Sequence, residues 1–364
     1  MRKIRGIFSP AVHRFITSLS PAALKCVKRL SRCVAAVLTA SSVPVVCACH
    51  FRPLTDPNLL TEVRVRINND GIQNVTCDVY NPAIPVQKIE PTAMHVLFYN
   101  DGDGSVAAES FITKVSADSE GYRVLSGEVQ LLPGNYRMLA YDFGTEETIV
   151  KDYYIWDKAK AYTDPVPSGV LSRFNTRGGE PAMDIRMEPE HLPVARLETE
   201  TIPYHDAPMT VTAEARSVVE SWYVQVHVDG IEWVNSAQAV LSGMVGENLI
   251  ATDTRVTEPE TSVWFSLKKS QDKGKDVVCT VFNTFGRIPD STDKLEITFD
   301  VSTVDKKIIR KTFDVTGLFR TENAVLHHWL LIDETIKVEP PKSSGGAFDP
   351  KIDDWDEEHR EIDI

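Results

Sequence analysis

The sequence lacks the short motifs that mark the common enzyme classes. It contains no Gly-x-Ser-x-Gly nucleophile elbow, no His-Glu-x-x-His zinc helix, no phosphate-binding glycine-rich loop and no dinucleotide-binding fingerprint. The pair His327 and His328 does not replace them, because neighbouring residues of a strand point to opposite faces and do not share one ion. We therefore expect no catalytic residue, no metal site and no cofactor.

Positive charge is scarce outside the N-terminal region. Residues 1–48 hold eight of the 39 Lys and Arg residues and no acidic residue, so the rest of the chain carries 31 basic against 52 acidic side chains. A body with a net charge near −21 repels phosphate backbones and gains nothing from counterion release. This balance argues against nucleic-acid binding.

No apolar run is suited to cross a membrane, because a spanning helix needs about 20 apolar residues. The stretch 33–49 is mostly apolar but is broken by Pro44, and it follows the basic segment 25–32. A basic segment, an apolar run and small residues before a cysteine are typical of a secretory signal. We expect this segment to direct export and then to be removed.

The end of this signal resembles that of bacterial lipoproteins, in which a cysteine thiol receives a diacylglycerol. Ala48 precedes Cys49, whereas the residue before Cys47 is a bulky valine, so Cys49 is the predicted lipidation site. We expect a lipoprotein signal peptide at 1–48 and a short tether at 49–58, with palmitate-type acyl chains holding the protein on a membrane. An ordinary secretory signal or a short helix is the alternative, and the leaflet stays open.

Cysteine is scarce once the signal is removed. The mature chain keeps Cys49, Cys77 and Cys279. Cys77 and Cys279 lie far apart in the sequence and fall in different expected domains, so we expect two buried thiols. A disulfide between them is the alternative in an exported protein.

Helical stripes of apolar residues are absent beyond residue 58, and period-two alternation takes their place. Val63, Val65 and Ile67 alternate with arginines, which predicts a strand with one face in a core. The turn at 100–104 and the Pro133-Gly134 turn each predict two joined strands. A calcium loop at 100–104 is the alternative, although the ligand spacing of an EF-hand is missing.

The polar, irregular stretch 165–181 predicts a loop, and we place a domain boundary near residue 190. The expected domains are 59–190 and 191–340, which makes the protein all-β. Strands are predicted in the second domain at 195–199, 209–215, 222–228, 239–244, 263–267, 277–284, 295–301, 306–315 and 325–332. Their near-regular spacing favours an antiparallel β-sandwich.

The acidic C-terminal tail at 341–364 begins with prolines, serines and glycines and ends with Trp355, Ile362 and Ile364. Its composition predicts disorder or local packing. The apolar residues near its end also allow a strand that pairs with an exposed sheet edge, in this molecule or in another.

Six segments, taken in order, are informative together: LPGNYR (132–137), LSGM (241–244), FNTFG (282–286), TFDVT (312–316), GGAFDP (345–350) and DDW (353–355). With the lipoprotein-like start, they resemble a fimbrillin-like lipoprotein family of Bacteroidetes, many of whose members carry only a domain-of-unknown-function label. That family is similar to fimbrial anchor and minor subunits. The resemblance implies two tandem transthyretin-like antiparallel β-sandwich domains, assembly with fimbrial subunits by strand exchange, a place on the cell outer membrane and a role in cell adhesion. It implies no active site.

Three functions follow from these observations. The leading one is a lipid-anchored fimbrial anchor or minor subunit. The second is a surface glycan-binding lipoprotein, because several tryptophans would stack on sugars if they were exposed, although core packing is expected for most. The third is a hydrolase, since the many carboxylates leave room for a catalytic pair. The candidate tryptophans are Trp222, Trp233, Trp264, Trp329 and Trp355, of which only Trp355 is expected to be exposed.

Overall fold

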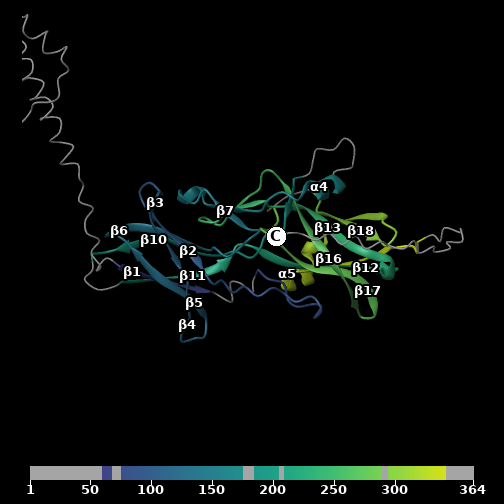
Figure 1. Cartoon of the computed structure of the whole chain (residues 1–364), viewed down its shortest axis with the longest axis horizontal. Helices are drawn as coiled ribbons and strands as arrows, with labels where there is room; N and C mark the ends of the chain where they lie inside the picture. The colour runs from purple at the N-terminus through teal and green to yellow at the C-terminus, as the bar shows by residue number, and fades with distance from the viewer. Residues whose placement is uncertain (1–59, 68–74, 175–183, 205–208, 289–293, 342–364) are drawn as a thin grey trace, which may run out of the picture. The chain divides into compact units, whose positions relative to one another are not determined.

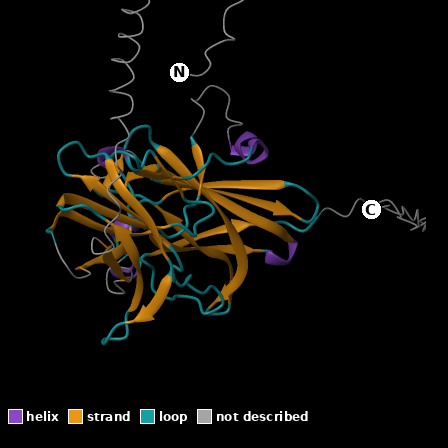
Figure 2. Ribbon diagram, turned by 60° about the vertical axis from the view of Figure 1, so that its left-hand side comes forward, coloured by secondary structure: helices purple, strands orange, loops and turns teal. Residues whose placement is uncertain are grey.

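The computed structural model describes residues 60–67, 75–174, 184–204, 209–288 and 294–341 (Figure 1). These residues form three β-sheets and a few short helices, and Figure 2 shows how strongly strands dominate. The protein is therefore all-β, as the alternating sequence pattern predicted.

The first sheet has the strand order β3-β2-β6-β10-β11-β1-β5-β4, and all of its pairings are antiparallel except that of β1 with β11. Its strands are β1 (Leu60–Ile67), β2 (Met94–Asn100), β3 (Val106–Ile112), β4 (Lys114–Ala117), β5 (Arg123–Gln130), β6 (Gly134–Asp142), β10 (Pro193–Ile202) and β11 (Met209–Ser217). The inward side chains of β1, β2, β5, β6, β10 and β11 meet in one apolar cluster, so the sheet curls around its own core.

Alternation explains these strands locally. In β11, Val211, Ala213 and Ala215 are buried, and the residues between them are exposed. In β1, Val63, Val65 and Ile67 are buried as predicted. The predicted turn at 100–104 joins β2 to β3, whereas residues 131–133 connect β5 to β6 without the positive φ expected at Gly134, and these two strands are not neighbours in the sheet.

The second sheet has the order β19-β18-β13-β16-β17-β12-β20, with β9 added beside β16. Its strands are β9 (Ile185–Met187), β12 (Glu220–Asp229), β13 (Val234–Met244), β16 (Thr261–Asp272), β17 (Lys275–Thr284), β18 (Glu296–Thr303), β19 (Ile308–Asp314) and β20 (Trp329–Lys337). Val224, Val226 and Val228 face its core, as predicted, and Phe265 stacks on Phe282 at 4.2 Å between ring centroids. The β12–β20 and β9–β16 pairings are parallel.

The third sheet is formed by two hairpins from distant parts of the chain. Strands β7 (Ile149–Lys151) and β8 (Lys160–Tyr162) make one hairpin, and β14 (Glu247–Leu249) and β15 (Thr254–Val256) make the other. Pairing of β8 with β14 joins them. This small sheet links the segment after the first sheet's β6 to the segment after the second sheet's β13.

Two segments differ from the predicted secondary structure. The expected loop at 165–181 contains the helix α4 (Ser168–Phe174), and the expected strand at 325–332 is divided between the helix α5 (Glu322–His327) and β20. Thr321 caps α5 by accepting the Ala324 N–H, and His328 ends it in the left-handed region at φ 56°. The strand prediction failed at Val325 and Leu326 because both are apolar yet exposed.

The remaining helices are single 3-10 turns: η2 (Trp156–Lys158), η3 (Ile231–Trp233) and η4 (Leu318–Arg320).

The two sandwich domains are present, but the chain passes between them later than residue 190. Strands β10 and β11 belong to the first sheet, so the chain enters β12 of the second sheet only after Ser217. Strand β9, in contrast, precedes them in sequence and pairs within the second sheet. Alternation identifies a strand but not the sheet to which it is hydrogen-bonded, which is why the sequence misplaced the crossing.

Candidate functional site

The predicted signal peptide at 1–48, the lipidation site Cys49, the tether and the tail from residue 342 lie outside the described residues. Within the described ranges, no helix is both long enough and apolar enough to span a bilayer. The structural features that bear on function are therefore the junction of the two sandwiches, the covering of the second sheet and the placement of the first strand.

The junction has its own apolar core, separate from those of the two sandwiches. Residues of β2 and β6 from the first sheet meet the loop around η2 and residues that flank β14. Tyr99 lies edge-on to Trp156 at 5.3 Å, and its hydroxyl donates to the Tyr153 carbonyl at 2.6 Å. Val245, Ile250 and other residues of the second half of the chain pack into the same cluster. Both halves of the chain are thus buried against each other here.

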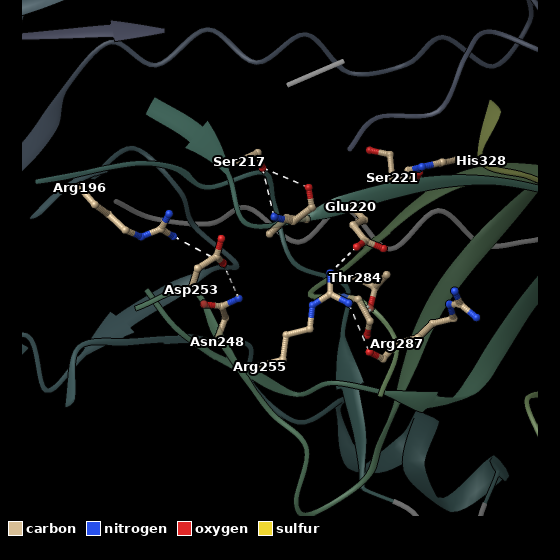
Figure 3. Close-up of polar contacts among 12 residues, drawn as sticks. Arg196, Ser217, Glu220, Ser221, Asn248, Asp253, Arg255, Thr284, Arg287 and His328 are labelled. Atoms are coloured by element: carbon tan, nitrogen blue, oxygen red, sulfur yellow. Dashed lines mark hydrogen bonds and ion pairs between the residues drawn. The ribbon is translucent and has the colours of Figure 1, made fainter. Parts of the chain in front are cut away.

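A charged cluster at the start of β12 fastens this junction. Arg255 of β15 is ion-paired to Glu220, and its guanidinium also donates to the Arg287 carbonyl at 3.4 Å (Figure 3). The guanidinium lies against Gly286, at φ +106°, where an added Cβ would collide with it. Arg287 turns away from this pair and lies over the Phe319 ring, and burial lowers the pKa of Arg287. The ion pair with Glu220 therefore belongs to Arg255, and Arg287 packs on an aromatic ring instead.

A second polar contact joins β10 to the turn between β14 and β15. Arg196 donates through Nε to the Ile250 carbonyl at 2.5 Å, and its Nη2 lies 3.6 Å from the Asp253 carboxylate. Asn248 donates to the same carboxylate at 3.3 Å (Figure 3). Burial lowers the pKa of Arg196, and the nearby Asp253 opposes that effect. This arginine ties the first sheet to the third.

Two buried titratable groups lie where β9 leads into β10. The His191 ring nitrogens lie 2.9 Å from the Ser217 hydroxyl and 2.6 Å from the Ser221 hydroxyl. Burial lowers the pKa of His191 to about 4, so the imidazole is neutral at pH 7. Glu188 accepts the Asn283 N–H at 3.2 Å, but burial raises the pKa of its carboxyl to about 7. The contributions of His191 and Glu188 to the stability of the fold therefore change with pH in opposite directions.

A segment from the N-terminal part of the chain covers the outer face of the second sheet. We call residues 75–86 the strap. The Tyr80 hydroxyl donates to Asp272 at 3.0 Å, Asn81 donates to the Ser270 hydroxyl at 2.9 Å, and the Trp329 indole donates to the Asp78 carbonyl at 2.8 Å. Its apolar residues pack on Tyr223 and Leu331. Residues 75–86 are therefore a component of the second domain, although β1 before them belongs to the first sheet.

Cys77, in the strap, and Cys279, on β17 of the second sheet, lie in the same small cluster. Both are buried free thiols, as predicted. The expectation that they belong to different domains was wrong, because the strap carries Cys77 onto the second sheet. Burial raises the pKa of both thiols, that of Cys77 to about 12, so neither is a ready nucleophile.

Strand β1 lies in the interior of the first sheet, hydrogen-bonded to β5 on one side and to β11 on the other. Its outward Arg66 contacts three carboxylates: Asp118 at 2.9 Å, Glu120 at 2.5 Å and Glu214 at 3.4 Å. The guanidinium also lies 3.9 Å from the centroid of the Tyr122 ring. Strand β1 is thus held by its backbone hydrogen bonds, by its buried apolar side chains and by the ion pairs of Arg66.

Residues 78–265 match the sequence profile of a family described as a domain of unknown function, DUF5119. The chain belongs to this family. It is also 21% identical over 348 residues to a Bacteroides ovatus protein provisionally named fimbrium anchoring subunit Fim4B, in a match that covers 86% of this chain and 93% of that relative.

Two solved structures are similar to this chain to different degrees. A Bacteroides ovatus protein provisionally described as an adhesin shares the fold at a TM-score of 0.55 and 19% identity, over 81% of this chain and 98% of that one. The fimbrial anchor protein Mfa2 of Porphyromonas gingivalis is similar at a TM-score of 0.44 and 13% identity, over 76% and 90% of the two chains.

The histidine pair of this DUF5119 chain is not placed on a strand as expected. His327 ends α5 and lies 2.7 Å from the Asp78 carboxylate, whereas His328 lies 3.1 Å from the Ser221 carbonyl and stacks on Trp222. Within the described residues, no group of three or more His, Cys, Asp or Glu side chains is arranged to hold a metal ion. Both histidines are used to hold the strap and β20 in place.

An open hollow of about 410 Å³ lies beside the end of β12, the start of β17 and the second half of β20. His227, Asp229, Asp276 and Asp333 are among the residues that line it. It opens broadly to solvent, unlike the deep pocket with facing carboxylates that a hydrolase would need. A similar hollow of about 320 Å³ lies on the outer face of β1, β4 and β5 and is lined by the ion pairs of β1.

The tryptophans do not form an exposed platform in the described part of the chain. Trp222 is buried against Phe319, and Trp329 lies under the strap, while Trp233 and Trp264 are partly buried. Core packing, expected for most of the tryptophans, is confirmed for Trp222. Trp355 lies outside the described residues. The strongly exposed aromatic side chains are instead Phe111, Phe143, Tyr154 and Tyr204, which the sequence did not single out.

Proposed function

We propose that this protein is a lipid-anchored subunit of a cell-surface fimbrium, acting as its anchor or as a minor subunit in assembly and adhesion. The observation that carries the proposal is the similarity to a fimbrium anchoring subunit along almost the whole length of both chains. The shared β-fold with an adhesin agrees with it. The relatives are named as fimbrial proteins and not as enzymes, so the proposed role is to bind and hold, without catalysis.

The proposed attachment is a diacylglycerol on Cys49 after removal of residues 1–48. Each methylene buried in a membrane contributes about 0.8 kcal/mol, so several chains on one residue give durable anchoring to the outer membrane. Strand β1 begins at Leu60, only eleven residues after the proposed lipid. A load on the protein would therefore reach the first sheet through a short tether.

The proposed partners are fimbrial subunits that pair with this protein by strand exchange. Strands β3, β4, β19 and β20 end the two large sheets and each pairs with one neighbouring strand there, so an incoming strand has backbone groups to bind. The alternative donor is the C-terminal tail of this protein, which would pair with an edge of another subunit. The outer edges of β3, β4, β19 and β20 support the first possibility, in which this protein accepts a strand from another subunit.

Mass spectrometry of the mature N-terminus tests the attachment. We expect the first residue to be Cys49 with acyl chains, and we expect Cys49→Ser to abolish both the acylation and the recovery with outer membranes. Cys47→Ser is the matched control and keeps both. A mature form that begins elsewhere without lipid would overturn the anchoring part of the proposal.

Co-purification from native membranes tests the partnership. We expect the full chain, solubilised in mild detergent, to bring down pilin-like chains in a complex that resists dilution, since strand pairing adds many backbone hydrogen bonds. Recovery of a clean monomer from fimbriated cells would contradict the assembly role, whatever the state of Cys49.

A further inference from the structure

Two pairs of aromatic side chains lie around His95 beside the junction, three of them exposed and Tyr153 partly buried, and we call these four residues the aromatic platform. They are Phe111 of β3, Phe143 after β6, and Tyr153 and Tyr154 between β7 and η2. Phe111, Phe143 and Tyr154 are 52%, 58% and 61% exposed. The Phe111 and Phe143 rings lie 4.9 Å apart, and those of Tyr153 and Tyr154 lie 4.6 Å apart. A patch of this kind on an acidic, polar surface indicates a binding site.

A buried histidine holds the platform from below. His95 of β2 is 3% exposed, and its ring nitrogens lie 2.8 Å from the Tyr141 hydroxyl and 3.1 Å from the Glu109 carboxylate. Its ring stacks on Phe111 at 4.4 Å and meets the rings of Phe143 and Tyr153 edge-on. Three of the four platform rings are therefore packed on one fixed side chain, which lowers the entropic cost of binding a ligand.

The polar groups beside the platform are hydrogen-bond acceptors and hydroxyls. Glu109 shares the outer face of β3 with Phe111, and its side chain is half exposed although one oxygen is near His95. Asp142 directly precedes Phe143, and the two tyrosine hydroxyls lie 3.4 Å apart. Among the described residues, none of the cation–π contacts involves these four rings. This chemistry disfavours anionic ligands and suits a neutral molecule rich in hydroxyl groups.

The exposed area of the platform indicates whether its partner is a protein or a smaller molecule. Aromatic side chains bury roughly 150–250 Å² each, so four rings at about half exposure offer on the order of 400 Å². A stable protein partner needs about 800 Å² on each side. Two or three sugar rings, whose C–H faces stack on aromatic rings while their hydroxyls donate to carboxylates, fit the smaller area.

We propose that the aromatic platform binds a neutral oligosaccharide, with Phe143 and Tyr154 as stacking residues and Glu109 as the hydroxyl acceptor. This assigns a glycan site to side chains that are not tryptophans, and it does not depend on lipid anchoring or strand exchange. Under this proposal the protein binds a sugar ligand in addition to its partner subunits.

Saturation-transfer NMR and calorimetry on the full chain test the site. The probes are methyl α-D-mannopyranoside, methyl β-D-galactopyranoside and methyl β-D-glucopyranoside, with a linear trisaccharide of each sugar. We expect at least one trisaccharide to bind, more tightly than its monosaccharide. A sialylated trisaccharide is the charged comparison, and we expect weaker binding because the half-exposed Glu109 carboxylate repels its carboxylate.

Substitutions locate the binding. Phe143→Ala and Tyr154→Ala should each lower the affinity about 3- to 10-fold, the cost of one aromatic stacking contact, and the double variant should bind below detection. Glu109→Gln should also weaken binding, whereas Tyr154→Phe keeps the stacking and most of the affinity. Tyr204→Ala is the matched control, because Tyr204 is 71% exposed but follows β10, near the opposite end of β6 from Phe143.

Two results would overturn the proposal. One is that no neutral probe binds. The other is that the Phe143→Ala and Tyr154→Ala variants bind sugar as tightly as the wild-type chain. Loss of co-purifying protein chains in these variants, without sugar binding by the wild type, would identify the platform as a protein contact and would likewise reject the glycan site.

Discussion

The sandwich cores and the junction between them are stabilised differently. In the cores, alternate strand residues are apolar and buried, as Val211, Ala213 and Ala215 show in β11. The junction combines an apolar cluster with buried or half-buried ionisable groups, including Glu188, His191 and Arg196. Apolar contacts tolerate small shifts, whereas ion pairs and hydrogen bonds require defined geometry. The cores therefore supply stability, and the junction fixes how the two sheets meet.

The largest expected effect is in a core. Phe265→Ala removes a fully buried ring that stacks on Phe282, and a change of this kind costs about 3–5 kcal/mol. Urea denaturation followed by fluorescence would measure it. If the junction couples the domains, the whole molecule unfolds in one earlier transition. A separate, unshifted transition for the first sandwich would show that the junction transmits little stability.

The next effect is at the junction. Glu220→Ala leaves Arg255 without its paired carboxylate, and we expect a loss of about 1–3 kcal/mol because both partners are only partly solvated. The control is Glu62→Ala, which breaks an exposed pair with Arg64 and should cost under about 0.5 kcal/mol. Equal losses of stability for the two variants in thermal unfolding would show that the junction ion pair contributes no more than an exposed one.

The pH dependence of the junction offers a finer test. The folded-state pKa of Glu188 is raised to about 7, so its contribution favours folding at low pH and is lost as the pH rises from about 4.5 through 7. Glu188→Gln should therefore be more stable than the wild type at pH 8, by about 1–2 kcal/mol, with the gain vanishing near pH 4.5.

His191 has the opposite sign and serves as an internal check. Its folded-state pKa is lowered to about 4, so stability falls as the pH drops from about 6.5 towards 4. The wild type and Glu188→Gln share this fall, and the difference between them reports Glu188 alone. If the extra stability of Glu188→Gln persisted unchanged at pH 4.5, the raised pKa of Glu188 could not be its cause.

The smallest effect on global stability is expected in the strap. Tyr80→Ala removes a hydrogen bond to Asp272 and a ring contact with Trp329 at 4.9 Å, and it should loosen the strap locally. Thiol labelling followed by peptide mass spectrometry should show faster modification of Cys77 and Cys279, with little change in Tm. Tyr204→Ala is the control, and labelling that matches this control would show that the strap does not protect the thiols.

The sequence predicted the cores well and the contacts of the strap poorly, for a physical reason. Alternation at Val63, Val65 and Ile67 is a local pattern, and it identifies a strand and its buried face without knowledge of the partner strand. The contact of Asp78 with His327 joins residues 249 positions apart, and no local pattern records it. The same holds for the contact of Cys77, in the strap, with the cluster that contains Cys279. Lipidation at Cys49 stays a prediction.

The interior position of β1 determines how the molecule bears load. A pull applied to the chain ahead of Leu60 acts along the axis of β1, while its backbone hydrogen bonds to β5 and β11 run across that axis. The bonds on both sides are then loaded in shear and must fail together, whereas a terminal edge strand peeled sideways would lose its bonds one at a time. The fold thus resists tension at the end that enters the first sheet.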